Sequence, residues 1–244
     1  MPFTLAHPAI VIPFYRLFKE RLSLTGLIIG SMVPDVEYCV NTVTRSVISH
    51  TERGIWMFDL PVAIFLTFCY HGFVKQTLTN NLPAWFRYRL APYTNQNWFH
   101  YFRKNYLNYF FCLLAGIVLH LLWDSVSHGT GYFVRRSAFL QENVIGTLTV
   151  TRLIWHISTV VGLYVVIRFF LDFPVSKVEA DNSKPDKNFW PLVFLVASVL
   201  TIIHWLPFVR PQEPRFILVA FSGAMMVGVI VVSFIFRFYK KQLS

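Results

Sequence analysis

Apolar residues run through most of the chain in long stretches that short polar segments separate. A helix needs about 20 mostly apolar residues to cross the hydrocarbon layer of a membrane. Five stretches meet this requirement: Ile55–Val74, Tyr106–Asp124, Leu153–Phe173, Phe189–Phe208 and Phe216–Phe238. The pattern therefore predicts an all-α fold, a polytopic bundle with five full transmembrane helices.

The first 34 residues follow a different pattern. Pro8–Phe18 and Leu22–Val33 are apolar but too short to span a membrane, and the charged group Lys19-Glu20-Arg21 separates them. We predict two short helices that form an N-terminal hairpin packed against the bundle. Pro13 is expected to kink the first of them, because proline removes a backbone donor from a helix interior.

Composition supports a membrane protein and excludes two other classes. Hydrophobic residues occupy 55% of the 244 positions and charged residues 14%, against roughly 25% charged in an ordinary soluble domain. Disorder requires low hydrophobicity and high net charge, so it is excluded. A water-soluble globule is excluded as well, because a chain of this length could not bury so much apolar side chain.

The net charge of +10 would ordinarily suggest a nucleic-acid partner. Here the basic residues lie in the gaps between apolar stretches, which is typical of membrane topology. We therefore expect the lipid bilayer as partner and no nucleic acid. The segments 75–104 and 174–188 and the C-terminal tail carry more Lys and Arg than the opposite side. This asymmetry predicts a cytoplasmic C-terminus.

One predicted span ends in a stripe of polar residues. His120, Asp124 and His128 are spaced four apart, so on a helix they lie along one face. Imidazole and carboxylate groups from adjacent turns can reach one metal ion. Ionisable residues inside apolar segments are costly and usually mark function. The alternative for such a pair is a His–Asp hydrogen bond that holds helices together.

Further polar residues fall at the same end of the predicted spans. Asp35 and Glu37 follow an apolar helix, and His50 and Arg53 lie just before the span at Ile55. His7 opens the first short helix and His156 lies near the start of the span at Leu153. If the spans alternate and the N-terminal hairpin dips in and returns, the stripe converges at the outer face with His7, Asp35, His50 and His156. Arg53 would then be placed to hold a phosphate or to anchor the helix.

Several motifs resemble a bacterial integral-membrane family of unknown function. They are MPFTLAHPA at 1–9, GSMVPDVEY at 30–38, SH…G…FDLP at 49–61, HLLWDSVSH at 120–128 and RLIWHISTVVGL at 152–163. The resemblance covers residues 1–172 and implies a bacterial inner-membrane protein. It divides the chain into a motif-bearing membrane domain, 1–172, and two additional transmembrane helices in 173–244.

That family is similar, more distantly, to membrane-bound metal-dependent hydrolases and to zinc-dependent phospholipase C. The similarity implies a first metal set, which is Asp35, His50, His120 and Asp124. It implies a second ion at His7 with a bridging Asp124, and it makes His128 and His156 further ligands or substrate contacts. The chain departs from the phospholipase pattern at Val160, where a carboxylate would follow His156 by four residues.

These residues favour hydrolysis over other chemistry. Two divalent ions about 3.5–4 Å apart can activate a water for attack on a phosphorus or acyl centre. Imidazoles with carboxylates favour zinc, with manganese or iron as alternatives. Asp35, Glu37 and Asp124 are the candidate catalytic groups, with Glu37 as a base or as a partner that orients a ligand histidine. The expected substrate is a lipid or lipid-linked phosphate.

A non-catalytic membrane protein is the alternative. A transporter or an assembly factor could use the same His and Asp residues to carry ions or to hold helices together. A transporter site is expected near the bilayer midplane, whereas these residues lie at span ends. A purely structural network would bind no metal.

Overall fold

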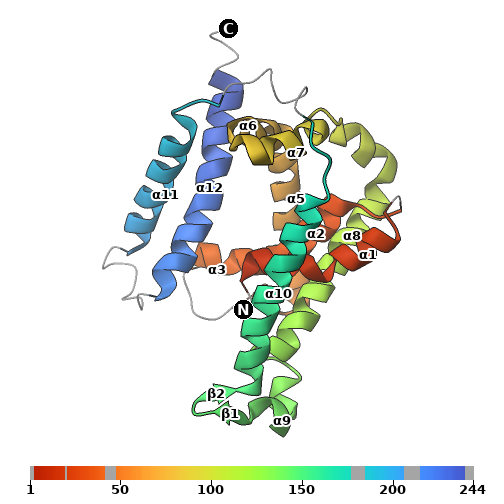
Figure 1. Cartoon of the computed structure of the whole chain (residues 1–244), viewed down its shortest axis with the longest axis vertical. Coiled ribbons are helices and arrows are strands. Elements are labelled where there is room, and N and C mark those ends of the chain that lie inside the picture. Colours follow the sequence, from red (N-terminus) through yellow and green to blue (C-terminus); the bar gives the residue numbers. More distant parts are fainter. Residues whose placement is uncertain (1–2, 20, 42–47, 177–184, 206–214, 240–244) are drawn as a thin grey trace. The chain divides into compact units, whose positions relative to one another are not determined.

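The computed structural model describes residues 3–19, 21–41, 48–176, 185–205 and 215–239. This part of the chain is nearly all helical (Figure 1). The α-helices are α1 (Ile12–Leu17), α2 (Leu24–Met32), α3 (Val36–Asn41), α4 (Glu52–Gly54), α5 (Leu60–Cys69), α6 (Lys75–Asn81), α7 (Ala84–Thr94), α8 (Trp98–Ser127), α9 (Ala138–Gln141), α10 (Val150–Leu171), α11 (Phe189–Trp205) and α12 (Arg215–Tyr239). The tighter 3-10 segments are η1 (Thr4–Ile10), η2 (Val33–Asp35) and η5 (Val134–Arg136), and the wider π segments are η3 (Ile55–Asp59) and η4 (Tyr70–Val74). Strands β1 (Asn143–Ile145) and β2 (Leu148–Thr149) form an antiparallel hairpin.

Four helices within the described ranges are long and apolar enough to cross a membrane. They are the continuous run Glu52–Asn81 from α4 to α6, α8, α10, and Ala220–Tyr239 of α12. This indicates an integral membrane protein. The predicted span Phe189–Phe208 corresponds to a shorter apolar helix, Phe189–Ile203. The last three residues of the predicted span, 206–208, lie outside the described ones. The count of five full spans therefore stays a prediction.

The N-terminal region forms three helical pieces where two were predicted. A 3-10 segment, η1, precedes α1, and the chain changes from one to the other at Val11. Pro13 lies in the first turn of α1, where a backbone N–H has no partner within the helix in any case. The predicted helix 8–18 is thus divided at Val11, two residues before Pro13, and the kink itself stays a prediction.

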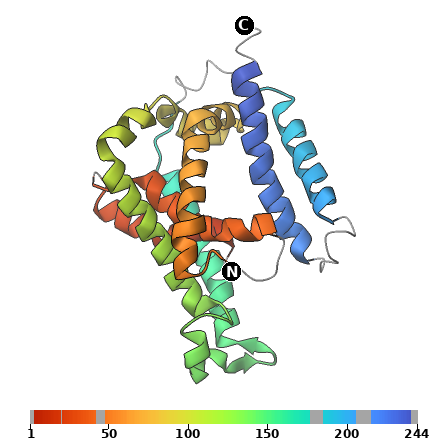
Figure 2. The same ribbon diagram turned by 180° about the vertical axis from the view of Figure 1, so that it is seen from behind.

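The chain forms two compact units, each built from three separate segments. The first unit contains Met1–Asp35, Ile48–Ile64 and Phe102–Asp172, and the second contains Val36–Val47, Phe65–Tyr101 and Phe173–Ser244. In the second unit, α11 and α12 lie side by side (Figures 1 and 2) and share a buried contact of Phe189, Val193 and Val232. The predicted division at residue 172 stays a prediction.

In the first unit, α2 packs closely against α8 through glycines. A Cβ atom at Gly30 would collide with the backbone carbonyl of Leu113, and one at Gly116 would lie 2.6 Å from the carbonyl oxygen of Leu27 and 2.8 Å from the nitrogen of Ser31. Small residues at such contacts let helix backbones approach each other in membranes. The end of α2 is thereby brought against α8.

Helix α8 contains one break in its helical backbone. Asn105 has φ −127° and ψ 26°, outside the helical region, so the helix consists of two pieces. The second piece begins at Tyr106, the residue at which the apolar pattern starts. This piece carries the polar stripe to the end of the helix at Ser127.

Candidate metal centre

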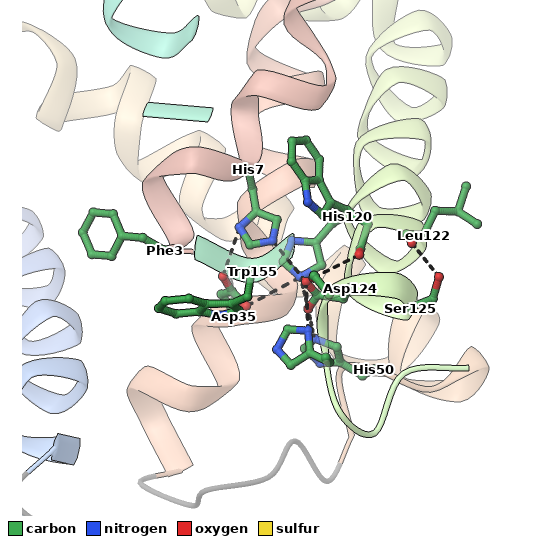
Figure 3. Close-up of polar contacts among 12 residues, drawn as sticks. Phe3, His7, Asp35, His50, His120, Leu122, Asp124, Ser125 and Trp155 are labelled. Atoms are coloured by element: carbon green, nitrogen blue, oxygen red, sulfur yellow. Dashed lines mark hydrogen bonds and ion pairs between the residues drawn. The ribbon is translucent and has the colours of Figure 1, made fainter. Parts of the chain in front are cut away.

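Six polar side chains from separate parts of the first unit gather at one place. Figure 3 labels all of them except His128. We call them the His/Asp cluster. Its members are His7 in η1, Asp35 at the end of η2, His50 before α4, His120 and Asp124 on α8, and His128 one residue past the end of α8. The predicted convergence of these residues is thus present in the structure.

The carboxylate of Asp124 is the centre of the cluster. Its Oδ2 atom lies 3.2 Å from Nε2 of His50 and 3.3 Å from Nε2 of His120. Its Oδ1 atom lies 3.3 Å from Nε2 of His7 and 3.3 Å from Nδ1 of His128. Each oxygen of this single carboxylate therefore faces a different pair of imidazole rings.

A second carboxylate, Asp35, closes the buried side of the cluster. Its Oδ1 atom is 3.6 Å from Nε2 of His120 and its Oδ2 atom is 3.5 Å from Nδ1 of His7. The rings of His7 and His120 stack with their centroids 4.1 Å apart. His7 therefore faces Asp35 with one ring nitrogen and Asp124 with the other.

The spacing of these atoms fits the coordination shell of a metal ion. One ligand atom from each of Asp35, His50, His120 and Asp124 lies within 4.8 Å of the others. Two ligands at about 2.1 Å from an ion in tetrahedral geometry are about 3.4 Å apart. The distances of 3.2, 3.3 and 3.6 Å that join the atoms of this group are close to that value. These four residues could hold a metal ion.

Fixed hydrogen bonds orient two of the imidazole rings. Nδ1 of His120 lies 2.8 Å from the carbonyl oxygen of Ser31, to which it donates. Nδ1 of His50 lies 2.8 Å from the hydroxyl of Ser49. In both rings the Nε2 atom is left facing the carboxylates. Histidine ligands of metals are commonly held in this way, because a hydrogen bond at one nitrogen fixes the lone pair of the other.

A tight turn holds His50 in place. The hydroxyl of Thr51 donates to the carbonyl of Ile48 at 2.7 Å and accepts from the N–H of Gly54 at 3.0 Å, so it caps the helix that begins at Glu52. A Cβ atom at Gly54 would collide with the same carbonyl of Ile48. The backbone at Ile48 therefore packs against the first turn of the helix, at Gly54.

The charges of the cluster require a positive partner. Nδ1 of His7, Nε2 of His120, Nδ1 of His128 and both oxygens of Asp35 are buried and have no hydrogen-bond partner among the described residues. With neutral imidazoles, the two carboxylates leave the site with two uncompensated negative charges. Burying an unpaired charge is very costly. A bound cation, or protons on the imidazoles, must therefore balance them.

The side chains of the cluster differ in their exposure to solvent. The side chains of His7, Asp35 and His120 are completely buried and Asp124 is 6% exposed, whereas His50 is 21% and His128 20% exposed. Within the cluster, His50 and His128 are thus the residues most exposed to solvent.

The remaining predicted site residues are Glu37, Arg53 and His156. Glu37 is completely buried on α3, which belongs to the second unit. Arg53 is exposed on α4, and His156 is exposed on α10 with its ring 4.6 Å from that of Trp155. Their predicted roles in catalysis or substrate binding stay predictions.

Sequence reasoning missed the two serines that orient the rings. Ser49 carries a recognisable signal, because a hydroxyl directly before a candidate ligand histidine is available to bond its ring. Ser31 contributes only its backbone carbonyl, and a carbonyl gives no residue-type signal.

Comparison with known proteins identifies the family but no function. The chain matches DUF4184, a domain of unknown function, over residues 1–236, and it belongs to that family. The match extends well beyond residue 172 and takes in α11 and most of α12. No curated protein and no solved structure matches the chain.

Proposed function

We propose that this chain is a membrane-bound metal-dependent hydrolase that acts on a phosphoester or a lipid headgroup. The observation that carries the proposal is the environment of Asp124, whose two carboxylate oxygens each face two imidazole nitrogens at 3.2–3.3 Å. A carboxylate placed in this way can bridge two ions or bind one. Sites with two metal ions are common in hydrolytic enzymes.

The first ion would be held by Asp35, His50, His120 and Asp124, and a second by His7 on the other oxygen of Asp124, with His128 as a further ligand or a substrate contact. Nitrogen and oxygen donors of this kind favour zinc. A bound divalent ion would supply an activated water for attack on a phosphorus or acyl centre.

The residues of the chain itself would perform the other tasks. Ser31 and Ser49 hold the rings of His120 and His50 in the orientation that binding requires. The complete burial of Asp35 and His120 keeps bulk water from that side. His128 lies at the exposed edge, so its imidazole is in position to contact the substrate. Arg53 and His156 are further candidates for substrate contact, and Glu37 for a base.

The distribution of Lys and Arg would put the cluster at the outer face of a bacterial inner membrane. Lipid headgroups and lipid-linked phosphates are present at that face. Asp124 lies three residues before the end of α8, which supports a site at the membrane boundary and not at the midplane, where transporters bind their substrates.

Hydrolysis by the purified full chain tests the proposal. The protein in detergent is incubated with bis(p-nitrophenyl) phosphate and with a short-chain phospholipid, before and after treatment with a chelator. We expect hydrolysis of at least one substrate, its loss with the chelator, and its return when zinc is added. A protein that contains stoichiometric metal but hydrolyses neither substrate would contradict the proposal.

A structural His/Asp network in a non-catalytic membrane protein is the second candidate. One observation favours it: the contacts of Asp124 with His7, at 3.3 Å, and with His50, at 3.2 Å, have hydrogen-bond geometry. In this case protons on the imidazoles would balance the carboxylates. The network would bind no metal, and loss of Asp124 would affect accumulation of the protein.

A further inference from the structure

Residues 129–149 connect the end of α8 to the start of α10, and we call this segment the cap. Figures 1 and 2 show it beyond the ends of both helices, with η5, α9 and the β1–β2 hairpin. Because α8 and α10 are both long and apolar enough to span a membrane, the segment that joins them lies at the membrane boundary.

The cap is held together by a buried residue and by hydrogen bonds. Val134 is buried at its centre, with 2% of its surface exposed. The side chain of Gln141 donates to the carbonyl of Val134 at 2.8 Å, and the hydroxyl of Thr151 donates to the carbonyl of Leu140 at 2.6 Å. These bonds connect η5 to α9 and α9 to α10. The backbone of the cap is therefore tied to α10.

The cap is joined directly to the exposed edge of the His/Asp cluster. The N–H of Gly131 donates to the carbonyl of His128 at 2.8 Å, and the N–H of Phe133 donates to the carbonyl of Ser125 at 3.1 Å. A Cβ atom at Gly131 would lie 2.9 Å from the carbonyl oxygen of Asp124. The first turn of the cap therefore packs on the turn of α8 that carries Asp124.

The outer surface of the cap combines apolar and cationic side chains. Phe133, Phe139 and Ile145 are 46%, 63% and 76% exposed. Arg135 and Arg136 are also exposed, and the Arg136 guanidinium lies over the ring of Tyr132, 3.8 Å from its centroid. The segment contains a single acid, Glu142. Apolar rings with basic side chains suit the headgroup layer of a membrane.

We propose that the cap binds an anionic phospholipid, with Arg135 and Arg136 on its phosphate and Phe139 and Ile145 in the acyl region. Guanidinium groups match phosphate because they offer paired donors in a plane. The headgroup would then lie beside His128 at the open edge of the cluster. Lipid binding stands independently of catalysis, whereas the assignment of this lipid as substrate rests on the proposed function.

Native mass spectrometry of the full chain in detergent tests the binding. The protein is mixed with phosphatidylglycerol or with phosphatidylcholine of the same acyl chains, and the bound lipid is counted. We expect preferential retention of phosphatidylglycerol. The double variant Arg135→Gln/Arg136→Gln should bind it at least about tenfold more weakly, because two charged hydrogen-bonding groups are lost.

The control is Arg87→Gln/Arg89→Gln on α7, which removes two arginines that also lie over aromatic rings, those of Tyr88 and Trp85. It should retain the preference. Equal loss in both double variants, or no loss in the first, would overturn the proposal. Displacement of the lipid by millimolar inorganic phosphate would also overturn it, since the site would then bind a free anion.

Two further variants separate this proposal from other effects. Arg135→Lys/Arg136→Lys keeps the charge but loses the paired donors, so it should bind more weakly than the wild type and more tightly than the Gln variant. This intermediate binding distinguishes loss of the site from unfolding of the Gln variant. Asp124→Asn should still retain phosphatidylglycerol even where metal and hydrolysis are lost. Loss of lipid binding in the lysine variant with an unchanged melting temperature would contradict recognition by charge.

Discussion

Each imidazole that faces Asp124 has its own environment, and the differences suggest separate roles. His120 is buried and its Nδ1 atom is committed to the carbonyl of Ser31. His50 is partly exposed and its Nδ1 atom lies against the hydroxyl of Ser49. His128 is partly exposed and belongs to the chain that leads into the cap. The buried ring is suited to hold an ion, and the exposed ring of His128 to contact a substrate.

The stripe of His120, Asp124 and His128 could be predicted from spacing alone, because residues four apart share a helix face. The approach of Asp35 and His50 to it could not. Their placement depends on how α2 and the turn before α4 pack against α8, which the spacing within the stripe does not indicate. It was expected from the resemblance and from the order of the spans.

The hydroxyl of Ser49 provides a test at the residue scale. Ser49→Ala removes the partner of His50 Nδ1 while leaving all cluster residues in place. We expect metal affinity to fall roughly 10- to 100-fold, because a ligand histidine loses the bond that orients it. Competition with a zinc chelator of known affinity measures this change.

The matched control is Ser125→Ala, next to Asp124 on α8, whose hydroxyl bonds the Leu122 carbonyl of its own helix at 2.6 Å. It should leave metal affinity unchanged. Equal affinities of the wild type and Ser49→Ala would show that this hydroxyl does not position His50 for an ion.

At the scale of elements, the contact of α2 with α8 sets the position of Ser31 relative to His120. Gly26 and Gly30 lie four residues apart on α2 and both approach the backbone of α8. This spacing of small residues is a known signal for close helix contacts in membranes, so the contact was in principle visible in the sequence. The break at Asn105 and the two π segments had no comparable signal, because a hydrogen-bond shift within a helix does not change its apolar pattern.

Gly30→Ala tests the importance of that contact. The added Cβ atom would meet the Leu113 carbonyl, part of a backbone that cannot rotate away. We expect the free energy of unfolding to fall by about 1–3 kcal/mol, as for other overpacked contacts, and metal affinity to fall with it. Unfolding in detergent, followed by circular dichroism, gives the first quantity.

Gly72→Ala is the control, since its Cβ atom would meet only the ring of Phe99 at 3.9 Å. It should be as stable as the wild type or slightly more so, because alanine favours a helix over glycine. If both alanine variants are equally stable, close packing at Gly30 does not contribute as proposed.

At the scale of the whole molecule, the membrane class follows from composition, and four spans agree with the apolar pattern. The orientation is a separate prediction. The segment 75–104 contains Lys75, Arg87, Arg89, Arg103 and Lys104 without an acid. It should therefore lie in the cytoplasm together with the C-terminal tail.

A reporter fused after Ser244 checks this orientation. An enzyme that is active only in the cytoplasm should be active in the fusion, and one that is active only outside should be inactive. A fusion of the same reporters within 143–147 should give the opposite pattern. External activity of the C-terminal fusion would reverse the orientation and move the His/Asp cluster to the cytoplasmic face.

The central claim is that the cluster binds a metal ion through Asp124, and metal analysis of the purified protein tests it most directly. Zinc per chain is measured by mass spectrometry for the wild type, for Asp124→Asn and for Asp172→Asn, whose carboxylate pairs with Arg16 and Arg168 away from the cluster. Asp124→Asn keeps the size of the side chain and removes its charge. We predict at least one zinc per chain in the wild type and in Asp172→Asn, and almost none in Asp124→Asn. Unchanged metal content in Asp124→Asn, a wild type that holds no metal after zinc is added, or failure of Asp124→Asn to accumulate would contradict the account.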